Sequence, residues 1–482
     1  MADVAADAQA VLEKLRAEHV RWVELFYTDI LGGTYHVHVP LETLEPESFV
    51  SGVPKLDGSS IKGFREIYES DMLLLPDLST LAYIPWHPEA GLTVRFICDI
   101  LMGGTREPFG HDPRGVARKT TQVLAQAGFD HSYWGPEIEF FVFDAVRLLP
   151  TPNAVRDAWG GAGYAVESAE APWQPSTGQA LIRFKDGYHR TDPHDTLSGL
   201  RGAMCEILAN QFRIVLDAHH HEVATAGQSE INIHYDELVP MADHVQDVRY
   251  VVRNVARQHG KVASFMPKPI YGDNGSGMHT NQSLWTGATN AFYDANDAYA
   301  EVSQVCRYYI GGLLEHARAL CAITNPITNS YRRLVPGYEA PVFIAWSRAN
   351  RSANVRIPVY HRGRPTVKRI EYRTPDAAAN IYLTQAALAL AGLDGIQRKI
   401  EPPPPVDHDI YKLTPAKRKE LAIRELPGSL GDALDCLASD HDFLKPAFPD
   451  SLLETFTELK REEQLQLDLR PHPYEFYRYM DV

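Results

Sequence analysis

The chain has few cysteines, and they are widely spaced. Its 482 residues include five, at positions 98, 205, 306, 321 and 436. None forms a C-x-x-C pair or a close metal-ligand spacing, which argues against a disulfide framework and against a cysteine-based zinc site. We therefore expect reduced, buried thiols.

Excess basic charge and long apolar runs are also lacking. The formal net charge is −15, so nucleic acid and anionic membranes are not expected as partners. No segment reaches the length of a membrane span, and the first residues do not combine a basic stretch with an apolar one. These absences predict a cytoplasmic protein.

The length and the apolar content favour a large globular protein of two or more domains. Hydrophobic residues make up 44% of the chain, enough for a sizeable core. Local patterns predict a helix over residues 6–18, then a strand over 21–27 and a turn at Gly32-Gly33 into a second strand. This indicates a small β-rich N-terminal domain that ends near residue 110.

The remainder has a mixed α/β pattern. Helical spacing is predicted at residues 113–126, 197–212, 242–258 and 298–320. Strands are predicted at 137–143, 229–235 and 369–373. Four prolines at 402–405 indicate an exposed connection to a helical C-terminal segment.

Acidic pairs recur at spacings that bring carboxylates together. Glu137 and Glu139 lie two apart on one strand, so their side chains share a face, and like charges at that distance require a cation. A solvated strand edge is the alternative. Glu222 and Glu230 enclose a loop of small residues that allows close approach of a ligand. The histidines before Glu222 alternate between strand faces and cannot all bind one ion, so a histidine-only zinc site is not favoured.

Glycine and arginine add phosphate-binding features. The Gly-rich segment 268–283 exposes backbone N–H groups beside His279, although such segments are often plain loops. Arg369, Glu371 and Arg373 form one row of a strand, which could also be a surface ladder. Five arginines crowd residues 332–356 and suggest bound phosphate or carboxylate. Carboxylates with at most one imidazole favour Mg²⁺ or Mn²⁺, and two such ions beside arginines indicate phosphoryl transfer.

Six motifs in order resemble prokaryotic type I glutamine synthetases. They are Leu56-Asp-Gly-Ser-Ser60, Gly135-Pro-Glu-Ile-Glu139, His220-His-Glu-Val-Ala-Thr-Ala-Gly-Gln-Ser-Glu230, Asn274-Gly-Ser-Gly-Met-His279, Arg333-Leu-Val-Pro-Gly-Tyr-Glu339 and Arg369-Ile-Glu-Tyr-Arg373. The resemblance implies an α+β fold, with an N-terminal β-grasp domain at 1–109 and a catalytic domain at 110–482 built on a curved antiparallel β-sheet flanked by helices. It also implies a dodecamer of two hexameric rings, with active sites between neighbouring subunits.

The resemblance also implies roles for individual residues. The first metal ion would be held by Glu139, Glu222 and Glu230, and the second by Glu137, His279 and Glu371. Glutamate would be bound by Asn274, Gly275, Arg333 and Arg373. The nucleotide and its phosphates would contact Asp217, Tyr235, Asn281, Ser283, Arg351 and Arg356, while Arg369 would stabilise the transferring group. The amine would be held by Tyr188, Glu222 and the neighbouring subunit's Asp57 and Ser60, with Glu339 closing over the intermediate.

The implied reaction is ATP-dependent ligation of an amine to L-glutamate. The γ-carboxylate takes the γ-phosphoryl group of ATP, and ammonia or a small amine then attacks the acyl phosphate. A catalytically silent scaffold is disfavoured, because such a protein has no need to retain all six metal ligands.

Several departures from the family pattern bear on the acceptor. Asn281 replaces a second histidine near the nucleotide, and residues 189–192 replace an apolar segment next to Tyr188. Glu66 stands where feedback-inhibited relatives carry arginine, and Tyr411, where some relatives are adenylylated, lacks the usual acidic flank. We therefore expect a primary organic amine of the alkylamine, polyamine or aniline type as acceptor, with ammonia as the alternative.

Overall fold

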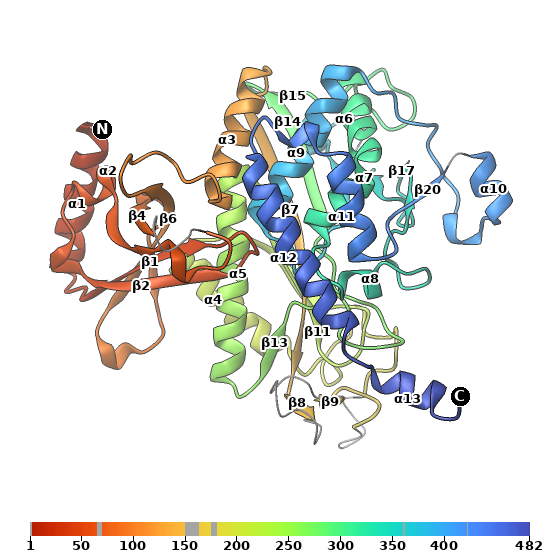
Figure 1. The fold of residues 1–482 in the computed structure, drawn as a ribbon, viewed down its shortest axis with the longest axis horizontal. Coiled ribbons are helices and arrows are strands. Elements are labelled where there is room, and N and C mark those ends of the chain that lie inside the picture. The colour runs from red at the N-terminus through yellow and green to blue at the C-terminus, as the bar shows by residue number, and fades with distance from the viewer. Residues whose placement is uncertain (1, 65–69, 150–162, 175–180, 360–361, 422) are drawn as a thin grey trace.

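The computed structural model describes residues 2–64, 70–149, 163–174, 181–359, 362–421 and 423–482. Glu66 lies outside these residues. The N-terminal domain and the larger C-terminal part lie side by side, with the two chain ends at opposite sides of the molecule (Figure 1).

The N-terminal domain is a six-stranded sheet with a helix packed on one side. Its strands run in the order β2-β1-β6-β4-β3, with β5 on β6, and only the β1–β6 pair is parallel. The strands are β1 (Trp22–Thr28), β2 (Thr34–Pro40), β3 (Val53–Asp57), β4 (Asp71–Pro76), β5 (Ala82–Ile84) and β6 (Thr93–Met102). Helix α1 (Ala2–Ala17) covers them, with the short α2 (Ser48–Ser51) beside it. This is the predicted β-grasp arrangement, and its apolar core is separate from that of the larger part.

The larger part is organised around a ten-stranded sheet. Its main order is β10-β11-β7-β14-β19-β18-β17, and every pair except β17–β18 is antiparallel. These strands are β7 (His131–Phe143), β10 (Leu216–His221), β11 (Gln228–Ile233), β14 (Thr280–Thr286), β17 (Trp346–Arg348), β18 (Val355–Ile357) and β19 (Ile370–Tyr372). Short strands β12 (Asp236–Glu237) and β13 (Val262–Ser264) pair with β7, and β15 (Thr289–Asn290) pairs with β14.

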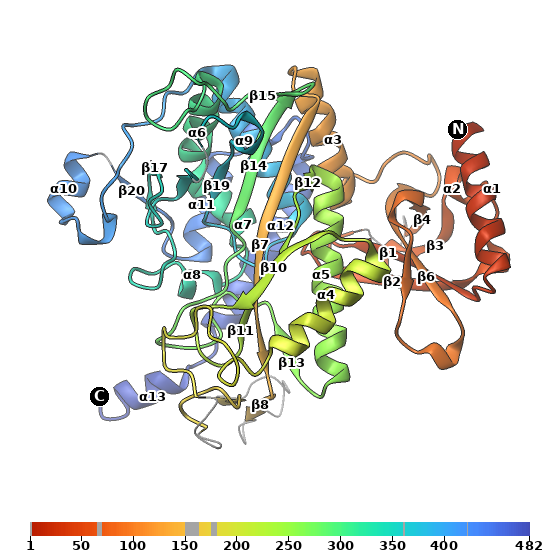
Figure 2. The same cartoon turned by 180° about the vertical axis from the view of Figure 1, so that it is seen from behind.

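Helices flank this sheet. The principal ones are α3 (Pro113–Gln126), α4 (Ser198–Phe212), α5 (Leu238–Gln258), α6 (Gln304–Glu315), α7 (Ala317–Thr324), α9 (Ile381–Arg398), α11 (Leu430–Ser439) and α12 (Asp450–Asp468). Figure 2 shows β7 and β14 in front of α9 and α12, so the helices α9 and α12 lie behind the sheet in that view. The chain ends in the short helix α13 (Pro473–Tyr479). The predicted α+β class with a helix-flanked antiparallel sheet is confirmed.

Four local features differ from what the sequence predicted. The segment predicted as one helix over 298–320 begins as a turn, in which the carboxylate of Asp297 accepts from the N–H groups of Ala300 and Val302, and continues as two helices, α6 and α7. Helix α9 was not predicted, and strand β7 begins six residues before Glu137. Of the five thiols, Cys98, Cys306 and Cys321 are buried as expected, but Cys205 and Cys436 are only half-buried.

An ionic network joins the two parts of the chain. Arg114 at the start of α3 contacts Asp77 and Asp99 of the N-terminal domain, and also Asp243 of α5. Arg95 of β6 is hydrogen-bonded to Asp247 of the same helix. Among the described residues, no helix is long and apolar enough to cross a membrane.

Candidate active site

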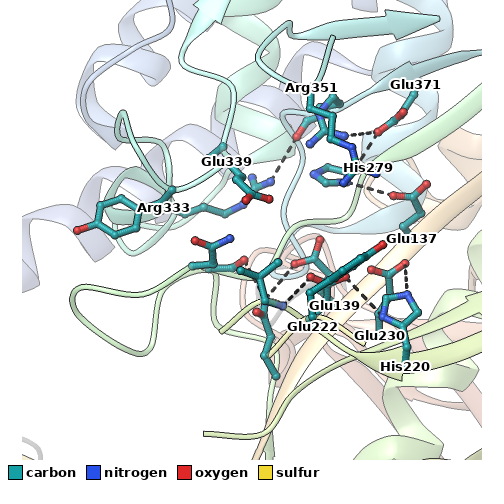
Figure 3. Close-up of a pocket in the computed structure, with 18 of the residues that line it drawn as sticks. Glu137, Glu139, His220, Glu222, Glu230, His279, Arg333, Glu339, Arg351 and Glu371 are labelled. Atoms are coloured by element: carbon teal, nitrogen blue, oxygen red, sulfur yellow. Dashed lines mark hydrogen bonds and ion pairs between the residues drawn. The ribbon is translucent and has the colours of Figure 1, made fainter. Parts of the chain in front are cut away.

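A polar cavity of about 220 Å³ collects most of the predicted site residues. It lies where β7, β11 and β19 and the loops beside them present charged side chains to one space (Figure 3). Its walls include all six predicted metal ligands and all four predicted glutamate-binding residues. Tyr188, Glu339, Arg351 and Arg356 line it too.

Glu139, Glu222 and Glu230 form an acidic group on one side of this cavity. Glu139 of β7 lies directly opposite Glu230 of β11, and Glu222 follows β10. Burial, and then the charge of Glu222, raise the pKa of Glu139 to about 8. Burial, and then Glu137 and Glu139, also raise the pKa of Glu230 well above its ordinary value. A divalent cation would remove this repulsion and keep the carboxylates ionised.

Glu137, His279 and Glu371 form a second group beside the first. Their ligand atoms all lie within 4.8 Å of one another. His279 Nδ1 is 3.1 Å from Glu137 Oε2 and 3.9 Å from Glu371 Oε1. Burial, and then the charge of Arg373, lower the pKa of His279 well below its ordinary value. The imidazole is therefore neutral, which is the form that binds metal.

His220 belongs to the site, although the sequence argument did not select it. Its Nδ1 lies 3.6 Å from Glu222 Oε1 and its Nε2 lies 3.8 Å from Glu230 Oε1. The neighbouring His221 points the other way and pairs with buried Glu170 at 3.0 Å. The alternation of side chains along β10 was the signal that could have identified His220, since only one of adjacent residues on a strand faces the carboxylates.

Gln228 connects the first acidic group to the Gly-rich loop. Its Nε2 donates to Glu139 Oε2 at 3.1 Å and to the carbonyl of Gly275 at 3.0 Å. Its Oε1 accepts from the N–H of Ala224 at 2.7 Å. A Cβ on Gly275 would lie 2.1 Å from the carbonyl oxygen of Pro267, so only glycine fits there. The side-chain oxygen of Asn274 is buried and, within the described residues, has no hydrogen-bond partner.

Arginines and a loop complete the cavity wall. Arg373 and Arg356 both donate to the buried carboxylate of Glu371. Arg333 donates to the carbonyl of Thr374 at 2.8 Å. The loop that carries Glu339 is held by Lys185, whose Nζ donates to the carbonyl of Gly337 at 2.7 Å.

Tyr188 stands at the rim of the cavity. Its ring stacks on that of His189, with centroids 3.9 Å apart, and His189 in turn lies edge-on to His220. Burial, and then the charge of Glu222, raise the pKa of Tyr188. The departure at residues 189–192 therefore shapes the rim, where a separate surface hollow includes His189, Arg190 and Thr191.

Not every predicted site residue lies in the cavity. Asp57 and Ser60 are on the N-terminal domain, where Asp57 accepts from the N–H of Ser59. Arg369 and Asn281 lie just outside the cavity wall: Asn281 accepts from Arg369 Nε at 2.9 Å and donates to Glu137 at 3.2 Å. The remaining nucleotide-side candidates do not line the cavity either, and they are Asp217, Tyr235 and Ser283.

The chain combines a β-grasp domain with an antiparallel sheet, and the sheet carries two adjoining metal-ligand groups faced by arginines. This combination defines an ATP-dependent ligase. The family model described as "Glutamine synthetase, catalytic domain" matches residues 110–479, and the one described as "Glutamine synthetase, beta-Grasp domain" matches residues 19–103. The chain belongs to the glutamine synthetase family and forms a carbon–nitrogen bond. Enzymes of this family use ATP with Mg²⁺ or Mn²⁺, in keeping with the two ligand groups.

Individual relatives extend over nearly the whole chain. A glutamine synthetase from Sulfolobus acidocaldarius is 49% identical, with 98% of each chain covered. That of Escherichia coli is 43% identical, covering 98% of this chain and all of its own. Among solved structures, the Plasmodium falciparum glutamine synthetase has a TM-score of 0.86 at 27% identity over 98% of both chains. A ligand-free GmaS has a TM-score of 0.80 at 26% identity, covering 98% of this chain and 99% of its own.

These names favour ammonia over the organic amine that the sequence departures suggested. The relatives with 43–49% identity carry the name glutamine synthetase. The organic amine expected from the changes at 189–192 and at Asn281 is not confirmed.

Proposed function

We propose that this protein is a glutamine synthetase proper, which joins ammonia to the γ-carboxyl group of L-glutamate at the expense of ATP. The observation that carries the proposal is that two ligand groups share one cavity with Arg333, Arg351 and Arg373. One group is Glu137, His279 and Glu371, and the other is His220, Glu222 and Glu230, with Glu139 directly opposite Glu230. The near-full-length similarity to proteins named glutamine synthetase supports it.

The donor atoms fit two hard divalent cations. Glu139, Glu222 and Glu230 would hold one, and Glu137, His279 and Glu371 the other; oxygen-rich sets of this kind suit Mg²⁺ or Mn²⁺. Burial, and then neighbouring carboxylates, raise the pKa values of Glu139 and Glu230, and divalent cations would offset the repulsion between these carboxylates. When bound, the ions would neutralise charge on the transferring phosphoryl group.

The chain's own residues would position the reactants. Arg333, Arg373, Asn274 and Gly275 would bind glutamate, so that a γ-carboxylate oxygen attacks the γ-phosphorus of ATP and ADP leaves. Arg351 and Arg356 would bind phosphate oxygens, Arg369 would stabilise the transferring group, and Asn281 would hold Arg369. The other nucleotide contacts would be Asp217, Tyr235 and Ser283.

Ammonia would then attack the acyl carbon, and inorganic phosphate would leave. Glu222 and Tyr188 would bind ammonium and accept its proton, and the loop with Glu339 would exclude water from the acyl phosphate. Asp57 and Ser60 would act from a neighbouring subunit, because they do not line the cavity of their own chain. This arrangement requires an oligomer, and a dodecamer of two hexameric rings is the proposed form.

The character of the cavity supports ammonia as acceptor. Among the described lining residues, Val223 and Ala340 supply the only aliphatic side chains. An alkyl or aryl amine gains affinity chiefly by burying apolar surface, and the cavity wall offers little apolar surface.

Two domains of the chain carry this chemistry, and we place their boundary between residues 109 and 110, in the connection from β6 to α3.

One assay separates the acceptors. ATP-dependent phosphate release with L-glutamate is measured with ammonium, methylamine, ethanolamine, putrescine and aniline. Ammonium should give the highest kcat/KM, by about 100-fold or more, because the organic amines would have to bury apolar groups against charge. A higher kcat/KM for any of the organic amines would overturn the choice of ammonia, while no turnover with any amine would overturn the ligase assignment.

A further inference from the structure

A third group of metal-ligand side chains lies on the N-terminal sheet, outside the catalytic cavity. Glu24 of β1 and His36 and His38 of β2 place ligand atoms within 4.8 Å of one another. His38 is directly opposite Glu24 in the antiparallel register, and His36 is two residues along the same strand. All three side chains therefore share one face of the hairpin.

The distances suit a bridging ion. His38 Nε2 lies 2.8 Å from Glu24 Oε1, and His36 Nδ1 lies 3.3 Å from Glu24 Oε2. Each oxygen of one carboxylate thus faces a different imidazole. Tetrahedral zinc with bonds of about 2.1 Å separates its ligand atoms by about 3.4 Å. Small side-chain rotations would bring the three donors to those positions.

The carboxylate is buried while the two imidazoles are exposed to solvent, and this arrangement favours binding of an ion. Glu24 is only 5% exposed, and within the described part of the chain its Oε2 makes no hydrogen bond, although the imidazole of His36 faces it at 3.3 Å. A buried carboxylate oxygen in that state is unfavourable. The histidine side chains are 43% and 45% exposed, so an ion can enter from solvent and keep positions for water.

Aromatic side chains restrain the two imidazoles, and the charged residue opposite the carboxylate is engaged elsewhere. Trp22 packs edge-on against His38, and Phe26 packs edge-on against His36. Such contacts restrict ring rotation and hold ligands in place before binding. Arg95 is opposite Glu24 in the register with β6, but its guanidinium is hydrogen-bonded to Asp247.

We propose that Glu24, His36 and His38 bind a divalent transition-metal ion of the Zn²⁺ type, separate from the catalytic ions. Two imidazoles and one carboxylate suit Zn²⁺, Co²⁺ or Ni²⁺, whereas Mg²⁺ prefers oxygen ligands. Because β2 is an edge strand, the ion would fasten the edge of the sheet to its neighbour β1. The fourth position would be filled by water or by a group from another molecule.

The test measures bound zinc in the intact oligomer. Protein stripped with EDTA is dialysed against Zn²⁺ in excess Mg²⁺, and zinc per chain is determined by elemental analysis. The variants are the double substitution His36→Asn with His38→Asn, the catalytic-cavity variant Glu371→Gln, and the control His87→Asn. His87 also faces a carboxylate, Glu89 at 3.3 Å, but belongs to no three-residue group among the described residues.

We expect the wild type and His87→Asn each to hold one more zinc ion per chain than the double variant, and Glu371→Gln to lose one zinc ion per chain when the double substitution is added to it. Zinc should also raise the Tm of the wild type and leave that of the double variant unchanged. Equal zinc contents in the double variant and the wild type would overturn the proposal.

A single substitution keeps the test usable if the double variant does not fold. His38→Gln should weaken zinc binding at least about 10-fold, since even loss of a group that merely supports a ligand costs 10- to 100-fold. Unchanged zinc affinity in His38→Gln would contradict the site. Turnover of glutamate is not the readout, so failure here is distinct from failure of the proposed ligase activity.

Discussion

Replacement of Glu371 by glutamine tests the catalytic assignment most directly. Glu371 is 1% exposed, and its two carboxylate oxygens accept from different guanidinium groups, those of Arg356 and Arg373. It also faces His279 at 3.9 Å as a proposed ligand of the nucleotide-side ion. Glutamine preserves the shape of the side chain but removes its charge and turns one acceptor into a donor.

The size of the effect follows from these contacts. A hydrogen bond to a charged group contributes about 1.5–3 kcal/mol, and glutamine loses one such bond together with the charge that attracts the ion. We take a loss of about 4 kcal/mol in transition-state stabilisation, which corresponds to a fall in kcat/KM of about 10³-fold. Folding should be retained, because the amide still accepts from one arginine.

The assay is ATP- and glutamate-dependent phosphate release, combined with Mn²⁺ binding by equilibrium dialysis. Glu371→Gln should bind one Mn²⁺ fewer per chain at a concentration that saturates the wild type, and gel filtration should give the same oligomer. Glu425→Gln is the control, since Glu425 is an exposed carboxylate whose contact with Arg418 is long, at 3.9 Å. Turnover within about threefold of wild type, or undiminished Mn²⁺ binding, would refute the reasoning.

Three further predictions concern the same cavity. Gly275→Ala should raise the KM for glutamate about 10-fold or more with a smaller change in the KM for ATP, because the new Cβ would displace the loop from Pro267; equal KM values would contradict the role of this loop. In metal-free protein, the raised pKa of Glu139 gives stability that is complete below about pH 4.5 and is lost as the pH rises through about 8. The Tm should therefore fall over that window, and Mn²⁺ should restore it most at the alkaline end, as measured by thermal melts with and without EDTA. A Tm that rises with pH would contradict this prediction. Lys185→Met removes the anchor of the Gly337 carbonyl and should increase phosphate release without ammonium about 3-fold or more relative to release with it; an unchanged ratio would argue against a water-excluding loop.

The residues at the centre of the site could be predicted because strand periodicity is a local property. Glu137 and Glu139 share a face in any strand, and the same holds for Arg369, Glu371 and Arg373. The register that sets Glu139 against Glu230 is not local, since it depends on pairing between segments about 90 residues apart. His220 was missed for a related reason: its relevance depends on which face of β10 meets the acidic group.

The missed elements have equally physical causes. Helix α9 is buried on almost every side, so its sequence lacks the polar stripe that identifies an amphipathic helix. The break between α6 and α7 occurs at His316, whose ring is held between Asp394 and Asp440, two residues from distant helical segments. Neither signal is present in a short window of sequence.

The amide of Gln228 connects the acidic group of the cavity to the Gly-rich loop, which would make ion binding and loop position dependent on each other. It touches Glu139 with the same nitrogen that holds the Gly275 carbonyl. An ion that drew Glu139 toward itself would therefore alter the loop proposed to bind glutamate, and by reciprocity glutamate would change the affinity for that ion by the same factor. Cooperative binding of manganese and glutamate, abolished when residue 228 is shortened to alanine, would be the solution signature of this single side chain.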